Sequence, residues 1–371
     1  MVSNNNAVYK SMYSWGRNSC NEITTSKHKS KSIDEVCSIL IDREIVSVQS
    51  GCKHTLMLTA SGKVYTCGAN TYGELGVQFC HKLKGPLCVT SLLGRRIVQI
   101  SAKGCCHNLA MTDDGSVYSW GSDCFGQLGH GDIIMSTSAP TEINSLRSKN
   151  IISVHAGGGA DVGYSFAVTK NRRLYSWGCN KTGQLALTKQ GQPQPYPKLV
   201  HSIDNVHQIS LGSFHVLCLT SRGVLIWGKH HSGPNFAPIL LKCFTFPEVI
   251  KVEAGHNCSF IVTKNEVFSW GNNTNGQLGL GHTYNVDEPT SIKELEDRRV
   301  KSIVAGSTNI TCLLYSGDVL TWGYNGFENR LGHDELTEAE YIPREVRRLK
   351  DQNVSEIMGG SAHQFALVNK R

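Results

Sequence analysis

Four histidines recur at one position of a repeated pattern and are the first candidates for chemistry. Each follows a glycine by three residues: Gly51 and His54, Gly104 and His107, Gly212 and His215, Gly360 and His363. Imidazole is a common metal ligand, but a shared ion requires bonds of about 2 Å, and equivalent positions of separate repeats should lie farther apart. We therefore predict hydrogen bonds within each repeat, and neither a metal ion nor a cofactor.

A glycine-rich stretch at residues 151–163 is the second candidate. Its strand-like start followed by glycines imitates a dinucleotide-binding turn. The spacing differs from Gly-x-Gly-x-x-Gly, and residues 164–169 continue as a strand, so no helix N-terminus would face a phosphate. We instead predict a protruding, flexible loop at Gly157, Gly158, Gly159 and Asp161. It is a candidate partner-binding site, because loops on rigid scaffolds often carry contacts; a tolerated insertion is the alternative.

The 14 cysteines include no Cys-x-x-Cys pair, which argues against a zinc ribbon. Cys218 and Cys312 stand where other repeats have a small apolar residue, and Cys67 replaces a repeated tryptophan. We predict structural thiols at these positions. Cys105 and Cys106 are the least explained pair, and a redox role remains open for them.

Basic residues recur just before a β-branched strand, in a chain of formal net charge +7. They are Arg43, Arg95, Arg96, Lys149, Arg298 and Arg299, with a further basic cluster at residues 27–31. Equivalent positions share one face, so these residues predict either a solvated rim or a docking surface for an acidic partner or DNA phosphate. His230 and His231 mark the shortest, degenerate repeat, which is either a contact site or a product of sequence drift.

A conventional active site is not visible, and we predict no catalytic residue and no enzyme. The sequence shows no Ser–His–Asp arrangement, phosphate loop or paired-carboxylate motif in a suitable setting. It also lacks an apolar stretch long enough to cross a bilayer and the blocks of a signal peptide. We expect an intracellular monomer, cytoplasmic or nuclear, without membrane insertion.

The elements that position these residues come from a repeat of about fifty residues. Its anchor before a glycine is Trp15, Cys67, Trp120, Trp177, Trp227, Trp270 and Trp322. In the best-formed unit, strands are predicted at residues 97–102, 108–112 and 117–120, followed by a fourth segment near Pro140. The turn Asp113-Asp114-Gly115 connects the second and third strands. The residue three places after the tryptophan is usually Asn or Asp, which can bond its own following backbone.

This pattern predicts an all-β fold: a seven-bladed β-propeller of four-stranded blades, spanning residues 1–371 as one domain. The chain starts with the Trp-Gly half of a unit and stops with its Gly-x-x-His half. Joining residues 366–368 to residues 12–15 restores a full unit. We therefore predict that N- and C-terminal strands pair to close the ring, which removes exposed sheet edges.

The motifs Val-Tyr-Ser-Trp-Gly, Gly-Gln-Leu-Gly and Gly-x-x-His resemble the repeats of the regulator of chromosome condensation family. The resemblance covers essentially the whole chain and implies a seven-bladed propeller. Members of that family act as exchange factors for Ran-type GTPases, chromatin binders, ubiquitin-ligase modules and a plant ultraviolet photoreceptor. The photoreceptors carry Trp where this chain has Cys52, Cys105 and Ser213, so light sensing is not expected.

Two further departures separate this chain from the family's founding exchange factor. The chain has neither the wedge-like insertion nor the basic N-terminal tail of that factor, and no ligase or kinase domain is expected in cis. The resemblance implies a non-catalytic protein-interaction propeller, either a regulator of a small GTPase or a guanine-nucleotide exchange factor-like partner for one. The alternative is a chromatin-associated module that binds nucleosomes through the basic face.

Overall fold

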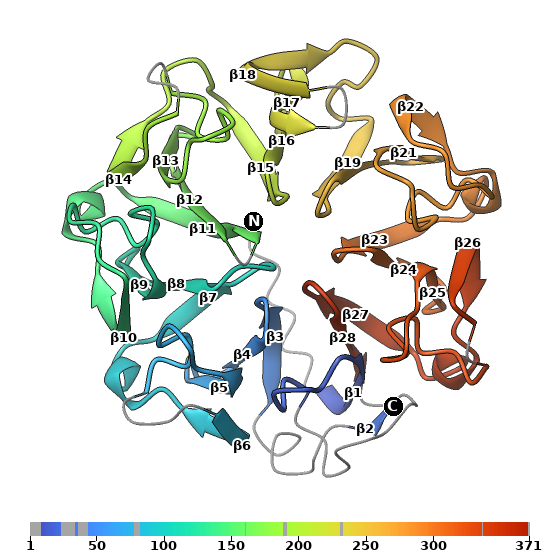
Figure 1. Cartoon of the computed structure of the whole chain (residues 1–371), viewed down its shortest axis with the longest axis horizontal. Coiled ribbons are helices and arrows are strands. Elements are labelled where there is room, and N and C mark those ends of the chain that lie inside the picture. Colours follow the sequence, from blue (N-terminus) through green and yellow to red (C-terminus); the bar gives the residue numbers. More distant parts are fainter. Residues whose placement is uncertain are drawn as a thin grey trace.

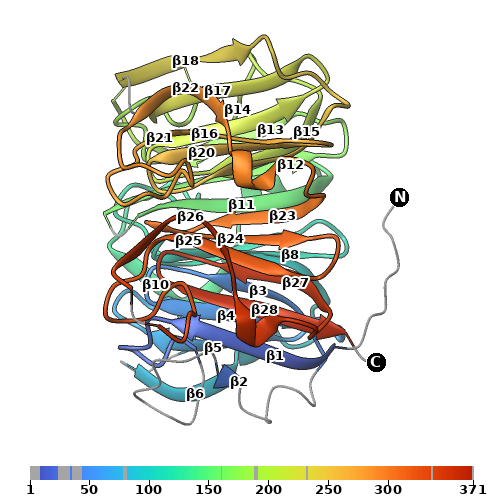
Figure 2. The same cartoon turned by 90° about the vertical axis from the view of Figure 1, so that its right-hand side faces the viewer.

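The computed structural model describes residues 9–23, 34–35, 44–77, 82–159, 161–187, 191–230, 233–335 and 337–369. These residues form seven four-stranded antiparallel sheets arranged around a central axis (Figure 1). The predicted all-β, seven-bladed propeller is confirmed. Figure 2 shows the same ring from the side, with the strands running across its thickness.

The blades, named A to G here, follow the chain from the innermost strand outwards, except that blade A combines both chain ends. Blade A contains β27 (Val354–Gly359), β28 (His363–Asn369), β1 (Tyr9–Gly16) and β2 (Asp34–Glu35). Blade B contains β3 (Ile45–Ser50), β4 (His54–Thr59), β5 (Val64–Ala69) and β6 (Lys82–Cys88). Blade C contains β7 (Ile97–Ser101), β8 (His107–Thr112), β9 (Val117–Ser122) and β10 (Ser136–Glu142). Blade D contains β11 (Ile151–Gly159), β12 (Val162–Thr169), β13 (Leu174–Gly178) and β14 (Gln194–Leu199). Blade E contains β15 (Val206–Leu211), β16 (His215–Thr220), β17 (Gly223–His230) and β18 (Gly233–Leu241).

Blade F contains β19 (Val249–Ala254), β20 (Cys258–Thr263), β21 (Val267–Gly271) and β22 (Val286–Ser291). Blade G contains β23 (Val300–Ala305), β24 (Asn309–Leu314), β25 (Val319–Tyr324) and β26 (Ala339–Glu345). Four short 3-10 helices precede the innermost strands of blades C, D, G and A: η1 (Thr90–Leu92), η2 (Asn144–Leu146), η3 (Lys293–Leu295) and η4 (Arg347–Leu349). Each of these helices buries one leucine.

The hydrophobic core lies between neighbouring blades. In β8 all six residues are buried, because blades B and D cover both faces of this sheet. One cluster joins Leu109 of blade C to Val154, Ala167 and Trp177 of blade D. No single blade encloses such a core, so its apolar side chains leave water only when a neighbour stacks on them.

The chain ends close the ring as predicted. Strand β1 pairs with β28 in an antiparallel register that sets Met12 opposite Leu367 and Trp15 opposite Gln364. Blade A is thereby completed by segments from both ends of the chain, and the strand edges of β28 and β1 are covered.

The linkers of blades A to D, F and G adopt the predicted side-chain-to-backbone turn. In blade C, Asp123 Oδ1 accepts a hydrogen bond from the backbone N–H of Leu128 at 2.9 Å. In blade F, Asn273 Oδ1 accepts the equivalent bond from Leu278 at 2.9 Å. The preceding Gly121 has φ +105°, and a Cβ there would lie 2.6 Å from the Cys106 carbonyl oxygen, so this position requires glycine.

The repeat motifs meet at the junctions between blades. At the junction of blades B and C, His54 Nε2 donates to Asn108 Oδ1 at 2.7 Å. Asn108 Nδ2 donates back across the junction to the Glu74 carbonyl oxygen at 2.8 Å, and the indole N–H of Trp120 donates to the same oxygen at 2.9 Å. The prediction that these histidines bond within their own blade is therefore wrong: each ring reaches the neighbouring sheet, because the second strands lie side by side in the stack.

The same network recurs on both sides of this junction. Between blades C and D, His107 Nε2 pairs with Ser165 Oγ at 2.8 Å, and the Gln127 carbonyl oxygen accepts from Ser165 at 2.9 Å and from Trp177 at 2.8 Å. Between blades A and B, the carbonyl oxygen of Glu22 accepts from Thr55 at 2.7 Å and from the Cys67 thiol at 3.3 Å. Cys67 thus replaces tryptophan in its hydrogen bond as well as its position.

Two other junctions lack parts of the network. Between blades E and F, His215 still pairs with Ser259 at 3.0 Å, but blade E has no Gly-Gln-Leu-Gly segment. Among the residues that the structure describes, the Trp270 indole consequently has no hydrogen-bond partner. Between blades G and A, Asn309 stands at the histidine position, and within the described chain both its amide atoms and the Trp15 indole nitrogen are buried without partners.

Candidate functional site

Two faces of the propeller carry the candidate residues. The innermost strands of neighbouring blades run parallel where bonds join them. Between β7 and β11, Gln99 Nε2 donates to the Val154 carbonyl oxygen and the Ala156 N–H donates to Ser101 Oγ, both at 2.9 Å. Between β15 and β19, the N–H groups of Val252 and Ala254 donate to Gln208 Oε1 and Ser210 Oγ in the same register. We name the face where these strands end, at Gly159 and its equivalents, the loop face. The face where they begin, at Ile97 and its equivalents, is the start face.

The predicted flexible loop of blade D is an extended hairpin on the loop face. Strands β11 and β12 remain paired to their tips, with Gly158 opposite Gly163 and Gly159 opposite Val162. The extra residues therefore lengthen two paired strands, where the sequence predicted a protruding, flexible loop. Gly158 has φ +127°, and a Cβ there would lie 1.8 Å from the Val162 carbonyl oxygen, so glycine permits this close pairing. Asp161 is exposed at the tip.

A cavity of about 210 Å³ opens beside this hairpin. Its lining includes Tyr72 from blade B, Cys106 and Phe125 from blade C, and Asp161 from blade D. The ammonium of Lys181 lies 4.7 Å from the centre of the Phe125 ring and adds a positive charge nearby. Three blades thus combine aromatic, thiol and charged groups around one concave site.

The sequence contained an unused signal for the aromatic residues of this cavity. Tyr72 and Phe125 both directly precede the glycine of the Gly-x-Leu-Gly motif, where other blades have Thr182 and Asn275. Their aromatic side chains in a polar turn mark the two adjacent blades that line the cavity.

His230 lies at the end of β17 and therefore also on the loop face. Its Nε2 atom contacts the side-chain amide of Asn235 on β18. His231 lies outside the described residues, so the structure tests only one residue of this pair. Blade E directly follows blade D, which brings this hairpin next to the blade that carries Asp161.

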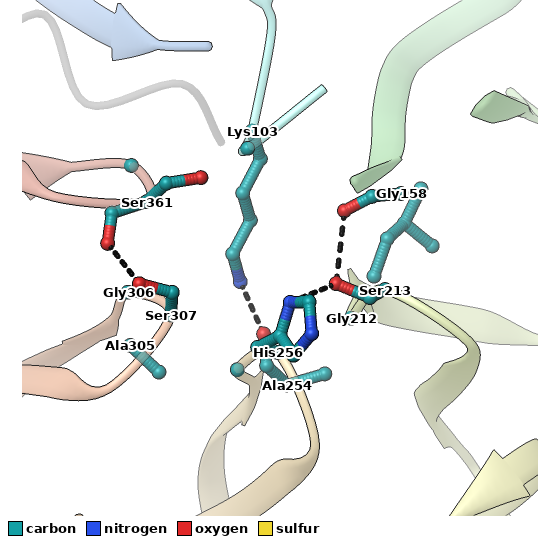
Figure 3. Close-up of a pocket in the computed structure, with 14 residues that line it drawn as sticks. Lys103, Gly158, Gly212, Ser213, Ala254, His256, Ala305, Gly306, Ser307 and Ser361 are labelled. Carbon is teal, nitrogen blue, oxygen red and sulfur yellow. Dashed lines mark hydrogen bonds between the residues drawn. The ribbon is translucent and has the colours of Figure 1, made fainter. Parts of the chain in front are cut away.

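On the loop face the Lys103 side chain, which sequence reasoning did not single out, extends from blade C towards Ala254 of blade F (Figure 3). Its ammonium crosses from blade C to donate to Glu253 Oε1 at 2.6 Å, to the Ala254 carbonyl oxygen at 2.8 Å and to Ser210 Oγ at 3.1 Å. A cavity of about 320 Å³ lies along the axis beside this group. The sequence feature that could have identified Lys103 is its position directly before Gly104, where other repeats carry a small or apolar residue.

The predicted basic residues lie on the start face and do not form one cluster. Arg95 and Arg96 precede β7 in blade C, whereas Arg298 and Arg299 precede β23 in blade G. All four are exposed. The Arg95 and Arg299 guanidinium groups each lie 5.0 Å from the centre of a tyrosine ring, those of Tyr118 and Tyr315. Arg43 and the basic cluster at residues 27–31 lie outside the described residues.

Acidic residues interrupt the positive charge on the start face. Asp113 and Asp114 occupy the hairpin turn of blade C, and Glu294, Glu296 and Asp297 surround the start of β23. The field of this face is therefore mixed in sign, which weakens long-range attraction of a polyanion.

The four histidines that share one position of the repeat do not form a metal centre in the described part of the chain. Burial lowers the pKa of His54 to about 4 and those of His107, His215 and His363 to about 3, so the rings are neutral at pH 7. Across the described ranges, no three potential metal-ligating side chains lie close enough together to hold an ion. The rings act as links between blades.

These features define a seven-bladed repeat propeller that carries the candidate residues on its two faces. The sequence model of the regulator of chromosome condensation (RCC1) repeat matches residues 61–111, 114–160, 173–219, 264–313 and 316–367. A second model of the same repeat matches residues 45–74 and 97–127. The chain belongs to the family of RCC1 repeat proteins.

The names of similar proteins indicate different functions. The chain is 30% identical to the E3 ubiquitin-protein ligase HERC2 of Mus musculus over 96% of its own length, but spans only 8% of that protein. It is 30% identical to the Ultraviolet-B receptor UVR8 of Arabidopsis thaliana, covering 74% of this chain and 63% of the receptor. It is also 25% identical to the RCC2 homologue of Danio rerio, covering 89% and 72% respectively.

Solved structures share the fold. Prp20p of Saccharomyces cerevisiae superimposes with a TM-score of 0.85 at 20% identity, covering 98% of this chain and 92% of that one. Human WBSCR16 superimposes with a TM-score of 0.79 at 20% identity, covering 97% and 99%. In the described part of the chain, no helix has the length and apolar character needed to cross a membrane.

Proposed function

We propose that this propeller is a non-catalytic protein-docking platform that regulates a small GTPase through its loop face. The observation that carries the proposal is the extended hairpin of blade D beside a cavity built by three blades. The tip of the hairpin presents the exposed Asp161, and the wall of the cavity contains Tyr72 and Phe125. Aromatic side chains next to a charged group on a rigid scaffold are typical of binding surfaces.

The action that we propose is binding, with no covalent step. The hairpin of blade D and the end of β17 at His230 in the adjacent blade E both lie on the loop face, so a partner docked there can contact both blades. Exchange would follow if docking of Asp161 and its neighbours favoured the nucleotide-free state of the GTPase. A ligand shifts such an equilibrium only by its difference in affinity for the two states. We place this activity in the cytoplasm or nucleus, with the propeller acting as a monomer.

The relatives support a GTPase partner. Prp20p, whose fold this chain shares at 20% identity, binds Gsp1p and histones. The ubiquitin-ligase name of HERC2 belongs to a protein of which this chain spans 8%.

The test measures release of a fluorescent guanine nucleotide from a panel of small GTPases. We expect the propeller to accelerate release from at least one of them, and Asp161→Lys to reduce the acceleration at least about tenfold, as expected for loss of a central interface charge. Asp113→Lys on the start face is the matched control and should retain activity. If no GTPase responds, or if both variants behave alike, the proposal fails.

Chromatin binding through the start face is a second candidate. The exposed Arg95, Arg96, Arg298 and Arg299 favour it, although acidic neighbours make the field weak. Phosphate contacts lose affinity as salt rises. Retention on nucleosomes should therefore fall steeply between low and physiological salt and disappear with Arg298→Glu combined with Arg299→Glu. Absence of retention at low salt would dismiss this candidate.

A further inference from the structure

A positively charged group of the chain already contacts one wall residue of the cavity beside the blade D hairpin. The ammonium of Lys181 lies 4.7 Å from the centre of the Phe125 ring, and Phe125 lines the cavity. The face of an aromatic ring carries partial negative charge, so it attracts cations and repels anions. Tyr72 adds a second aromatic side chain to the same lining. The aromatic part of the cavity therefore favours a positively charged occupant.

Equivalent turns in blades B and C hold the two aromatic side chains in place. The N–H of Tyr72 donates to Glu74 Oε2 at 2.7 Å, and the N–H of Phe125 donates to Gln127 Oε1 at 2.8 Å. Both aromatic side chains are half-buried, so part of each remains accessible to a ligand. The turns fix the backbone before a partner binds, and a preorganised site loses less entropy on binding.

Asp161 supplies the charge that complements such an occupant. Among the described residues it is the one carboxylate of the cavity lining, which contains no Lys, Arg or His side chain. Asp161 is exposed and forms no hydrogen bond or ion pair with another described residue. The neighbouring amide of Gln127 is already engaged, because its Oε1 atom accepts from Phe125 and its Nε2 atom donates to Ser122 Oγ at 3.2 Å. The polar group left for a ligand is therefore a negatively charged acceptor.

We propose that this cavity binds an arginine side chain presented by the protein partner of the loop face. The inference rests on the proposed function, because it names the side chain by which that partner docks. A guanidinium can stack on an aromatic face, here Tyr72 or Phe125, while two of its N–H groups donate to the Asp161 carboxylate. Arginine is favoured over lysine because its planar group is more weakly hydrated and matches a carboxylate through two bonds. The cavity volume of about 210 Å³ accommodates one long side chain.

Lys181 opposes this occupant, and its position gives the site a distinctive response to substitution. Its ammonium repels a second cation and competes with it for the Phe125 ring. Lys181→Met should therefore strengthen arginine binding, whereas Asp161→Asn should weaken it. A carboxylate in the cavity would give the reverse order, because it would pair with Lys181 and be repelled by Asp161. The signs of the two effects thus identify the charge of the occupant.

The experiment uses exposed Cys124, which lines the cavity, as a reporter and exposed Cys243, which does not, as the reference. The full chain is alkylated with iodoacetamide at neutral pH in the presence of the peptide N-acetyl-glycyl-arginyl-glycinamide, and mass spectrometry follows each cysteine. We expect the peptide to slow alkylation of Cys124 at least about fivefold, with a midpoint on the order of 1 mM for one anchoring side chain. Alkylation of Cys243 should not change. The citrulline peptide, which has the same shape without the charge, should require at least about tenfold more, and the glutamate peptide should not protect Cys124.

Variants of the two charged residues complete the test. Asp161→Asn should raise the midpoint for the arginine peptide at least about threefold, and Lys181→Met should lower it about twofold. Lys149→Met, which removes an exposed lysine from the start face, is the matched control and should leave the midpoint unchanged. Saturation-transfer NMR of the peptide measures the same midpoints without alkylation.

Three results would overturn the inference: no protection of Cys124 by the arginine peptide, equal protection by the arginine and citrulline peptides, or weaker arginine binding in Lys181→Met. Peptide binding requires no GTPase, so the two proposals fail separately. Accelerated nucleotide release without protection by the peptide would refute this inference alone. Protection by the peptide without a response from any GTPase would refute only the proposed function.

Discussion

The junction between blades B and C and the junction between blades E and F have the same packing but different hydrogen bonding. At the first, one carbonyl oxygen of Glu74 accepts from Asn108 and Trp120, and Asn108 accepts from His54. At the second, the His215–Ser259 bond is what remains of this network among the described residues. Both junctions bury their tryptophan, with exposed fractions of 0% for Trp120 and 4% for Trp270. The bonds to the linker carbonyl oxygen are therefore not required to form a blade junction, because blades E and F remain joined by apolar stacking and by bonds between their innermost strands, such as Val252 N–H to Gln208 Oε1 at 3.0 Å and Ala254 N–H to Ser210 Oγ at 2.9 Å.

The difference follows from the linkers. The regular Gly-x-Leu-Gly turn places one carbonyl oxygen where the next blade can reach it. Blade E has lost the turn, and blade G carries one more residue between Trp322 and Leu331 than blade C carries between Trp120 and Leu128. At the junction that follows each of these blades, the tryptophan indole has no partner among the described residues.

Acidification gives the largest expected effect and separates blades with buried histidine from those without. Burial depresses the folded pKa values of His54, His107, His215 and His363 below the unfolded value of about 6.5. The stabilising contribution of each neutral ring is complete above that value and is lost as pH falls towards the folded pKa. At pH 5 each ring should reduce the free energy of unfolding by about 2 kcal/mol.

Hydrogen exchange between pH 7 and pH 5, corrected for intrinsic rates, checks this expectation. Protection should fall earlier in β4 and β16 than in β20 and β24, whose corresponding positions hold Cys258 and Asn309. Asp123, whose pKa burial raises to about 6, acts in the opposite direction in blade C. Uniform loss of protection around the ring would contradict a local role for the histidines.

Trp120→Ala should cost the next largest amount. Removing a buried tryptophan costs about 3–5 kcal/mol of unfolding free energy, and Trp120→Ala also removes one hydrogen bond to Glu74. Trp270→Ala at the junction of blades E and F is the matched comparison. It should cost about 1 kcal/mol less, because the Trp270 indole makes no such hydrogen bond among the described residues. Denaturant titration of both variants measures the difference. Equal losses would show that the indole bond contributes nothing.

Substitution of the two junction asparagines should have opposite signs. Asn108→Leu leaves the His54 ring without its partner and should cost about 1–3 kcal/mol. Asn309→Leu removes two amide atoms that are already buried without partners among the described residues, so we expect stability to stay equal or rise by about 1 kcal/mol. Thermal melting of both variants tests the contrast, and a large loss for Asn309→Leu would show that its amide has a partner after all.

The smallest expected effect concerns the thiol that replaces tryptophan. Cys67→Ala removes both a buried sulfur and its bond to the Glu22 carbonyl oxygen. Cys312→Ala removes a buried sulfur from blade G, where no hydrogen bond of the thiol is recorded among the described residues. Cys67→Ala should lose about 0.5 kcal/mol more, since a thiol is a weak donor. Indistinguishable denaturation midpoints would refute the hydrogen bond of Cys67.

The sequence alone determined the number of blades, the strand order and the closure of the ring. These follow from local signals: Trp120 and its equivalents, the Asp114–Gly115 turn, and the unit divided between residues 12–15 and 366–368. Turn chemistry and strand alternation act over a few residues, so one repeat can be interpreted without its neighbours. The turn made by Asp123 was predictable for the same reason.

Only the tertiary structure decided what the repeats do to one another. The direction of the His54 bond, the reach of Lys103 across the axis and the meeting of Tyr72 with Asp161 beside one cavity all depend on side chains from different blades. Their sequence separations of about one repeat or more carry no local signal. Stacking brings equivalent positions together, and the hydrogen bonds form wherever the packed sheets leave polar groups that must be satisfied away from water.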